Sequence, residues 1–424
     1  MRRRTAWLGF GMLAVGLVGG QLQAQAVGSP AALGFSAERL ERIDRMMREA
    51  VDSNRVPGVA VMVLRRGKVA YQGAWGWVDR EAGRKMATDA VFRIASQSKA
   101  VTSVAVMMLL EEGRLTLGDP VSKWIPAFKD AKVASASDTG RVLTPVKRAI
   151  TIRDLLTHTA GISYGDDSLV RDDYTAAGLG PDLGPGWYFA DRTVPICEDM
   201  DRLGTLPFVA QPGEKFVYGY NTDILGCVVE RVSGLSLAEF FEQRIFRPLK
   251  MQDTRFYLPP DNRGRLTAVY QASDTGVARA PDGPTGQGDY VDGPRVSYAG
   301  GAGLLSTTRD YARFLQMLLN GGTLDGVRLM GPRTVRLMVS DQIDSLYKSP
   351  GSGFGLGFEI LENPGLAGQY GWVGRFGWGG AYGTNYWVDP SEGLVAVYMI
   401  QFPTAAARDL LTRFRNLVYQ AIVE

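Results

Sequence analysis

Ser96 and Lys99 are the two residues whose types and spacing best suit nucleophilic chemistry. They stand three positions apart at the start of a strongly apolar run that extends from 101 to 110. Residues three apart on a helix share one face, so this hydroxyl and this amine can meet. A helix N-terminus favours negative charge on the serine oxygen, and a buried amine can help to remove the hydroxyl proton. The pattern predicts a serine nucleophile activated by lysine, although Ser96 would also suit a helix N-cap.

Two further serines match catalytic spacings without the structural context that catalysis needs. Ser345 and Lys348 repeat the Ser-x-x-Lys spacing, but a proline and a glycine follow almost at once and prevent a helix. Ser163 lies in a Gly-x-Ser-x-Gly segment, which in α/β-hydrolases joins a strand to a helix and precedes a histidine in the chain. The single histidine, His158, comes before it. We therefore expect neither serine to be the nucleophile, and one histidine is too few for a His/Cys metal site.

The first 26 residues have the pattern of an export signal. Three arginines at positions 2–4 precede an apolar stretch over 6–19, and positions 24–26 read Ala-Gln-Ala, the small-x-small pattern of a cleavage site. An uncleaved N-terminal anchor is the alternative. The precursor has 47 basic and 44 acidic residues, so removing these three arginines leaves 44 of each. We predict an exported protein, periplasmic or secreted, with no nucleic-acid partner and no stable membrane partner after cleavage.

Cys197 and Cys227 are the only cysteines. They could pair in an oxidising compartment. The segment around Cys227 has the pattern of a buried amphipathic helix, which favours two unpaired cysteines, one of them in the core.

Helical and strand-like patterns follow one another in an order typical of an α+β fold. Helices are predicted over 36–51, 95–112, 152–157, 222–233, 236–245, 308–320 and 404–423, and strands over 57–64, 68–78, 370–378, 382–388 and 394–401. The segments 125–147 and 163–195 lack periodicity, and the second has the character of a rim or lid. We predict an antiparallel sheet built from the N- and C-terminal segments (27–95 and 300–424) and flanked by helices, plus a largely helical domain over 96–299.

Several segments together resemble the class C β-lactamase family, which includes penicillin-binding DD-peptidases and the family VIII carboxylesterases. The matching segments are 92–99 (Phe-Arg-Ile-Ala-Ser-Gln-Ser-Lys), 115–121, 155–161 (Leu-Leu-Thr-His-Thr-Ala-Gly), 248–254 and 300–307. The likeness is greatest to the family VIII carboxylesterases. It implies an active site between the sheet domain and the helical domain, and a structural role for His158.

The resemblance also implies a tyrosine partner for Ser96 and Lys99. The segment 216–226 resembles the family's Tyr-x-Asn motif, with Tyr218 at the tyrosine position as general base and then general acid. Tyr220 stands at the asparagine position, where it would contact substrate. Packing at a helix entrance is the alternative role for both tyrosines.

The third family motif, Lys-Thr-Gly, is replaced here by Trp378-Gly379-Gly380. The tryptophan removes a positive charge that would face a substrate carboxylate, while the glycines would let substrate approach the backbone. By resemblance, the backbone N–H groups of Ser96 and Ala381 form an oxyanion hole. A tight strand bend is the alternative role of this segment.

These features predict a carboxylesterase that forms an acyl-Ser96 intermediate from short-chain esters and requires no metal or cofactor. An aromatic rim would favour an apolar acyl or alcohol group: Tyr164, Trp187, Tyr188, Phe189, Tyr298 and Trp378. A β-lactamase or DD-peptidase-like amidase is the second hypothesis, against which Trp378 and Tyr220 both count. A non-catalytic envelope binding protein is the third, although a pure binder would need none of Ser96, Lys99 and Tyr218.

Overall fold

The computed structural model describes residues 27–424 except 139, 181–189, 275 and 284–286. The predicted export signal therefore lies outside the described residues, as do three aromatics of the predicted rim, Trp187, Tyr188 and Phe189. Within the part that is described, no helix combines the length and apolar character needed to cross a membrane.

One large antiparallel sheet joins the two ends of the chain, as predicted. Its order is β13-β14-β15-β16-β17-β1-β2-β3. In that order the strands are Ser352–Phe354, Glu359–Leu361, Phe376–Gly379, Asn385–Asp389, Leu394–Ile400, Gly58–Arg65, Lys68–Asp79 and Arg84–Lys85. The central pair is β1 with β17, in register from Val59 opposite Ile400 to Arg65 opposite Leu394. Every residue of β1 is buried, as expected for a strand covered on both faces.

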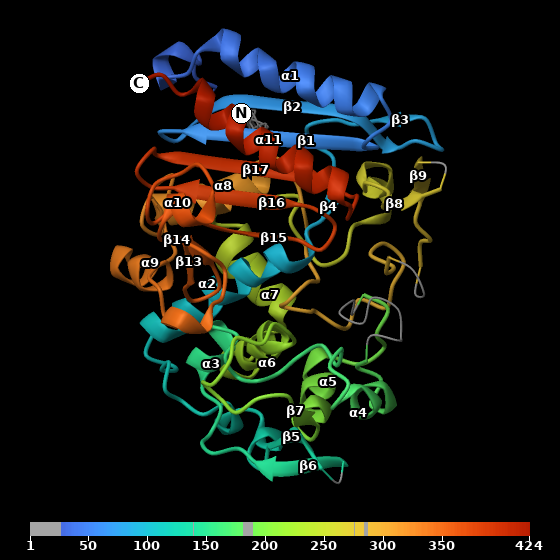
Figure 1. Ribbon diagram of the computed structural model, residues 1–424, viewed down its shortest axis with the longest axis vertical. Helices are drawn as coiled ribbons and strands as arrows, with labels where there is room; N and C mark the ends of the chain where they lie inside the picture. The colour runs from blue at the N-terminus through green and yellow to red at the C-terminus, as the bar shows by residue number, and fades with distance from the viewer. Residues whose placement is uncertain (1–26, 139, 181–189, 275, 284–286) are drawn as a thin grey trace, which may run out of the picture.

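Helices cover both faces of this sheet. On one face lie α1 (Ala37–Asp52) and α11 (Ala405–Ala421), which pack against each other, and on the other lies α8 (Thr308–Leu319) against β17 and β1 (Figure 1). Apolar side chains of α1, α11 and the sheet form one cluster, which includes Ile43, Val61 and Phe414. The oxygen of Ser36 accepts the Arg39 N–H and caps α1.

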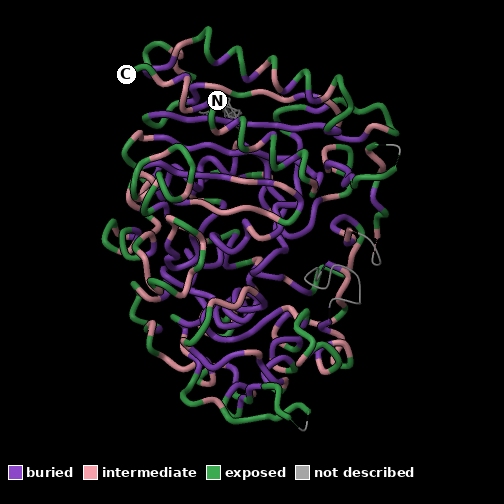
Figure 2. Tube along the Cα trace, viewed as in Figure 1, coloured by how far each residue is buried: buried purple, intermediate pink, exposed green. Residues whose placement is uncertain are grey.

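The helical part lies beside the sheet and centres on α2 (Ser98–Glu111). This helix is buried on nearly every side and packs against α6 (Asn221–Ser233), consistent with its apolar sequence. Around them lie α3 (Ile152–Leu156), α4 (Arg171–Ala176), α5 (Ile196–Leu203) and α7 (Leu237–Phe241). Figure 2 shows the central strands of the large sheet and α2 as mostly buried chain, with exposed chain around the outside of the molecule.

Short elements complete the fold. The small strand pairs are β4 (Phe92–Arg93) with β10 (Leu305–Ser306), β8 (Tyr270–Ser273) with β9 (Gly276–Arg279), and β11 (Thr323–Leu324) with β12 (Val327–Arg328). The remaining helices are α9 (Pro332–Met338) and α10 (Pro364–Ala367). A three-stranded sheet of β5 (Lys132–Ser137), β6 (Gly140–Pro145) and β7 (Pro207–Phe208) lies at the far end of the helical part.

Three sequence-based expectations need correction. The segment 125–147 contains the β5–β6 hairpin; β6 is exposed throughout, so no buried face marks it in the sequence. The strand predicted over 370–378 is only β15, because the exposed segment before it forms a loop. Cys197 and Cys227 form a disulfide, because the packing of α5 against α6 brings their Cα atoms to 5.0 Å.

Candidate active site

Ser96 lies in a 3-10 turn, Ala95–Gln97, that leads directly into α2. Ala95 has φ +44°, a left-handed conformation that a non-glycine residue adopts only when its surroundings hold it there. The Tyr311 hydroxyl donates to the Gln97 carbonyl at 2.8 Å and helps to fix the turn. Ser98, the next residue along, accepts the Leu304 N–H at 3.0 Å. The turn that carries the predicted nucleophile is therefore anchored from α8 and from the segment that leads into β10.

Lys99 is buried, with 2% of its surface exposed, and its ammonium group has three acceptors. It donates to Ser96 Oγ at 3.4 Å, to the Tyr164 hydroxyl at 3.0 Å and to the Gly301 carbonyl at 2.8 Å. The predicted meeting of Ser96 and Lys99 is therefore seen in the structure. Three acceptors match the three protons of an ammonium group, so the amine is held in one orientation.

Asp223 of α6 supports this arrangement from behind. Its carboxylate accepts the Gly301 N–H at 2.9 Å, while the carbonyl of the same glycine accepts from Lys99. Burial raises the pKa of Asp223 to about 6, although the nearby Lys99 charge acts in the opposite direction. Gly301 is tightly enclosed, since a Cβ there would lie 2.4 Å from the Asp223 carboxylate. The glycine peptide thus links the buried carboxylate to the amine.

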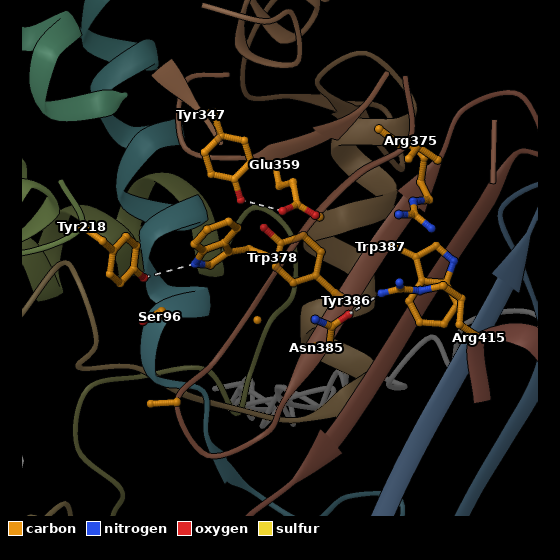
Figure 3. A pocket seen from close by; sticks show the side chains of 14 residues that line it. Ser96, Tyr218, Tyr347, Glu359, Arg375, Trp378, Asn385, Tyr386, Trp387 and Arg415 are labelled. Carbon is orange, nitrogen blue, oxygen red and sulfur yellow. Dashed lines mark hydrogen bonds between the residues drawn. The ribbon is translucent and has the colours of Figure 1, made fainter. Parts of the chain in front are cut away.

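Tyr218 lies with Ser96 in the wall of one cavity of about 450 Å³. The Lys99 ammonium is 4.7 Å from the centre of the Tyr218 ring, and Trp378 Nε1 donates to the Tyr218 hydroxyl at 3.1 Å. Figure 3 shows the Tyr218 and Trp378 side chains joined by this bond beside Ser96. Tyr218, the predicted general base, is therefore close to the amine of Lys99 and faces the same cavity as Ser96.

Tyr164, expected only at the rim, lies in the site itself. It is the tyrosine whose oxygen accepts a hydrogen bond from Lys99. Burial raises the pKa of the Tyr164 hydroxyl well above its ordinary value, so this phenol keeps its proton. Its neighbour Ser163 is buried, and its Oγ accepts the Gly165 N–H at 3.1 Å to close a turn. The Gly-x-Ser-x-Gly segment therefore supplies a tyrosine to the site, and no periodicity in the sequence could have indicated this.

Tyr220 and His158 both lie in the core. The Tyr220 hydroxyl donates to the Leu179 carbonyl at 2.7 Å, and the residue is fully buried at the start of α6. It does not line the cavity of Ser96, which argues against the expected contact with substrate. Burial and the nearby Lys99 hold the pKa of His158 well below its ordinary value, so the ring is neutral. Its Nδ1 lies 3.0 Å from Asn221 Nδ2, a structural contact in keeping with the expected role.

Only some residues of the segment 378–381 line the cavity. Trp378, Gly379 and Ala381 line the cavity together with Ser96, whereas Gly380 does not. A Cβ on Gly380 would lie 2.4 Å from the Ile94 carbonyl, so this glycine permits close packing against the segment before Ser96. The oxyanion hole formed by the Ser96 and Ala381 N–H groups stays a prediction, now with both residues in one cavity wall.

The second Ser-x-x-Lys pair has no such surroundings. Ser345 and Lys348 both lie outside the buried core, and a 3-10 turn covers only Asp344–Leu346. Burial of the amine and its hydrogen bond to the serine therefore separate Lys99 from Lys348.

Comparisons with known proteins identify the family and agree with the fold. The family described as Beta-lactamase matches residues 43–420. Protein Rv1367c of Mycobacterium tuberculosis is 37% identical over 383 residues, covering 84% of this chain and 88% of its own. Esterase EstB of Burkholderia gladioli is 31% identical over 381 residues, covering 86% and 91%. The solved structure of EstCE1, "a hydrolase with promiscuous acyltransferase activity", superposes with a TM-score of 0.75 at 27% identity, covering 90% of this chain and 99% of that one.

Proposed function

The chain belongs to the beta-lactamase family of serine hydrolases, and from that premise we propose that it is a carboxylesterase acting through an acyl-Ser96 intermediate. The observation that carries the proposal is the Lys99 ammonium, which is buried and 3.4 Å from Ser96 Oγ, beside a cavity lined by Ser96, Tyr218 and Trp378. The esterase EstB, 31% identical to this chain, supports an ester as the substrate.

In the proposed reaction Ser96 Oγ attacks the ester carbonyl. Tyr218, assisted by Lys99, takes the hydroxyl proton and passes it to the departing alcohol. The Ser96 and Ala381 N–H groups stabilise the oxyanion of each tetrahedral intermediate. Water then attacks the acyl-enzyme while Tyr218 takes a proton from it. The bond between the acyl carbon and Ser96 Oγ breaks, Tyr218 passes the proton to Ser96 Oγ, and the carboxylic acid leaves. Tyr164 stays protonated and holds the Lys99 amine in place.

Aromatic side chains in and behind the cavity wall, above all Trp378, support an ester as the substrate over a β-lactam. Trp378 occupies the position at which the resemblance would place a lysine, and its indole is held by Tyr218 and packs against Phe354 at 5.4 Å between ring centres. An indole offers no positive charge to the carboxylate of a β-lactam or of a D-Ala-D-Ala peptide. It does offer apolar surface to an acyl or alcohol group.

The test uses residues 27–424 and p-nitrophenyl acetate, butyrate and octanoate beside a chromogenic cephalosporin. Ser96→Ala should abolish ester turnover, whereas Ser163→Ala and Ser345→Ala serve as controls that leave it intact. Equal turnover by Ser96→Ala and the native chain would refute the proposal. A cephalosporin turned over faster than every ester would move the substrate class to β-lactams, and no turnover of any substrate would favour a binding protein.

We extend the proposal to an oxidising, extracytoplasmic location. The Cys197–Cys227 disulfide supports it, because such bonds persist mainly in exported proteins. Labelling of free thiols in protein taken directly from the producing cell would test this, since two reactive thiols would contradict the proposal.

A further inference from the structure

The cavity that contains Ser96 continues past Trp378 onto the other face of the sheet. Figure 3 shows Ser96 and Tyr218 on one side of Trp378, and Arg375, Trp387 and Arg415 on the other. All of these residues line the same cavity. The ester chemistry proposed above needs only the first side, so the second side is space that the reaction at Ser96 does not explain.

Alternating glycines on β15 make this extension. Gly377 stands between Glu359 of β14 and Trp387 of β16, and Gly379 stands opposite Asn385. Residues directly opposite each other in an antiparallel sheet project to the same face. With glycine at both β15 positions, that face of the strand has no side chains and becomes the floor of a trough. The trough is walled by its sheet neighbours and by Arg415 from α11.

Among the described residues, the two arginines at this end of the cavity donate hydrogen bonds only to neutral groups. Arg375 donates to Gln369 Oε1 at 2.8 Å and to the Tyr370 carbonyl, while Arg415 donates to the same Gln369 oxygen and, at 3.4 Å, to Asn385 Oδ1. All four hydrogen bonds end on amide or backbone oxygens. The Nε of Arg415 is buried without a hydrogen-bond partner among the described residues.

The charge of these arginines is only partly offset by their surroundings, since Glu359 is the one carboxylate that acts on Arg415 from the cavity wall. Arg375 is 5% exposed. Burial, followed by the nearby Arg375 charge, lowers the pKa of Arg415 to about 10. The one carboxylate among the described residues of the cavity wall is Glu359, which already accepts the Tyr347 hydroxyl at 2.6 Å. One buried guanidinium, Arg375, and one half-buried guanidinium, Arg415, face a single carboxylate and leave the trough with excess positive charge. Planar guanidinium groups suit a carboxylate.

We propose that the trough is an anion subsite, which takes a carboxylate carried by the ester at a distance from the bond that is cleaved. The proposal rests on the esterase function above and narrows its substrates to monoesters of dicarboxylic acids or esters of hydroxy acids. It also places the recognising charge beyond Trp378, at Arg375 and Arg415, and not at position 378.

Paired substrates that differ only in charge test this. On the acyl side, p-nitrophenyl hydrogen glutarate is compared with its methyl ester. On the alcohol side, 4-acetoxybenzoate is compared with methyl 4-acetoxybenzoate. An arginine–carboxylate hydrogen bond predicts a kcat/KM about 10- to 100-fold higher for the charged member of one pair, and that pair identifies the side of the ester that enters the trough. A charged-to-neutral ratio near or below one in both pairs would overturn the proposal.

Arg415→Gln should bring that ratio close to one. Arg413→Gln is the matched control from the same helix, since Arg413 is exposed and pairs with Asp409 at 2.8 Å. A fall of equal size for charged and neutral members in Arg415→Gln would contradict a role in charge recognition. Arg415→Lys keeps a cation and should restore part of the preference.

A binding measurement separates this proposal from the esterase function. Glutarate should raise the melting temperature of Ser96→Ala and of Ser96→Ala/Arg413→Gln, but not that of Ser96→Ala/Arg415→Gln. That result without any ester turnover by the native chain would retain the anion subsite and reject the esterase. Ester turnover without any effect of glutarate on the melting temperature, and without a preference for charged esters, would retain the esterase and reject the anion subsite. If the Arg415 variant fails to fold, the melting temperature of the native chain with and without glutarate still tests the subsite.

Discussion

Replacing each of the two tyrosines near Lys99 by phenylalanine separates the base from the positioning residue. Tyr218 faces the cavity with Ser96, and Tyr164 accepts a hydrogen bond from Lys99 and keeps its proton. Loss of a general base lowers the rate about 10²- to 10⁴-fold, so Tyr218→Phe should raise the barrier by about 3 to 5 kcal/mol. Its effect on folding stability should be near 1 kcal/mol, roughly the value of the hydrogen bond from Trp378 that it removes.

Tyr164→Phe should show the opposite balance. It removes one of three acceptors of a buried ammonium group, so the free energy of unfolding should fall by about 1.5 to 3 kcal/mol. Ser96 Oγ and the Gly301 carbonyl still hold the amine, so kcat/KM should fall by about tenfold or less, the equivalent of about 1.4 kcal/mol.

The measurements are kcat/KM with p-nitrophenyl butyrate and urea unfolding of both variants. Tyr298→Phe is the control, because its hydroxyl donates to the Arg295 carbonyl and does not contact Lys99. An inactive Tyr164→Phe beside an active Tyr218→Phe would assign the base to Tyr164 and refute the reasoning. Equal losses of about 10³-fold in both would refute it too, since the two phenols would then act as one unit.

Three further predictions concern stability. Replacing Cys197 and Cys227 by alanine should lower the free energy of unfolding by about 3.5 kcal/mol, the loop-closure value for their separation of 30 residues, and urea unfolding would show no change if the bond were absent. Burial tends to raise the pKa of Asp154, but hydrogen bonds from Arg148 and from Thr151 outweigh it and hold this pKa below its ordinary value. The stability that Asp154 contributes is therefore present above the pKa of the unfolded state and is lost as pH falls through the pKa of the folded state. Asp154→Asn should remove this dependence in unfolding measured over that pH range. The raised pKa of Asp223 has the opposite sign: stability should fall by ~3 kcal/mol as pH rises from the ordinary value of 3.8 to about 6, and unfolding of Asp223→Asn over that range should lack this slope.

The contact between Ser96 and Lys99 could be predicted from sequence because it depends on local structure. Ser96 and Lys99 lie within one turn of each other at the start of α2, and the apolar character of that helix on every side indicates that it is buried. The sheet built from both ends of the chain was also predictable, since its long strands have clear patterns. Short or exposed strands such as β6 lack that signal.

The remaining features depend on contacts between distant segments. The Tyr164–Lys99 contact joins residues 65 positions apart, and the disulfide requires α5 to lie on α6. The trough beyond Trp378 requires Arg375 before β15 and Arg415 on α11 to meet at the same place. Such contacts follow from how the segments pack in three dimensions. The number of residues between the partners therefore carries no signal that could have predicted them.

The pairing of β1 with β17 has a consequence for how the molecule folds. Val59 can pair with Ile400 only after nearly the whole chain has been synthesised, and α1 can pack against α11 only at the same late stage. Closing so large a loop lowers the conformational entropy of the chain before the contacts between β1 and β17 can stabilise it, and this slows folding. During synthesis the apolar strand β1 therefore lacks its central neighbour until the last strand emerges, and in that interval it is exposed to aggregation. A chain that ended before Leu394 would lack both β17 and α11, so the protein should reach its native state only as a whole.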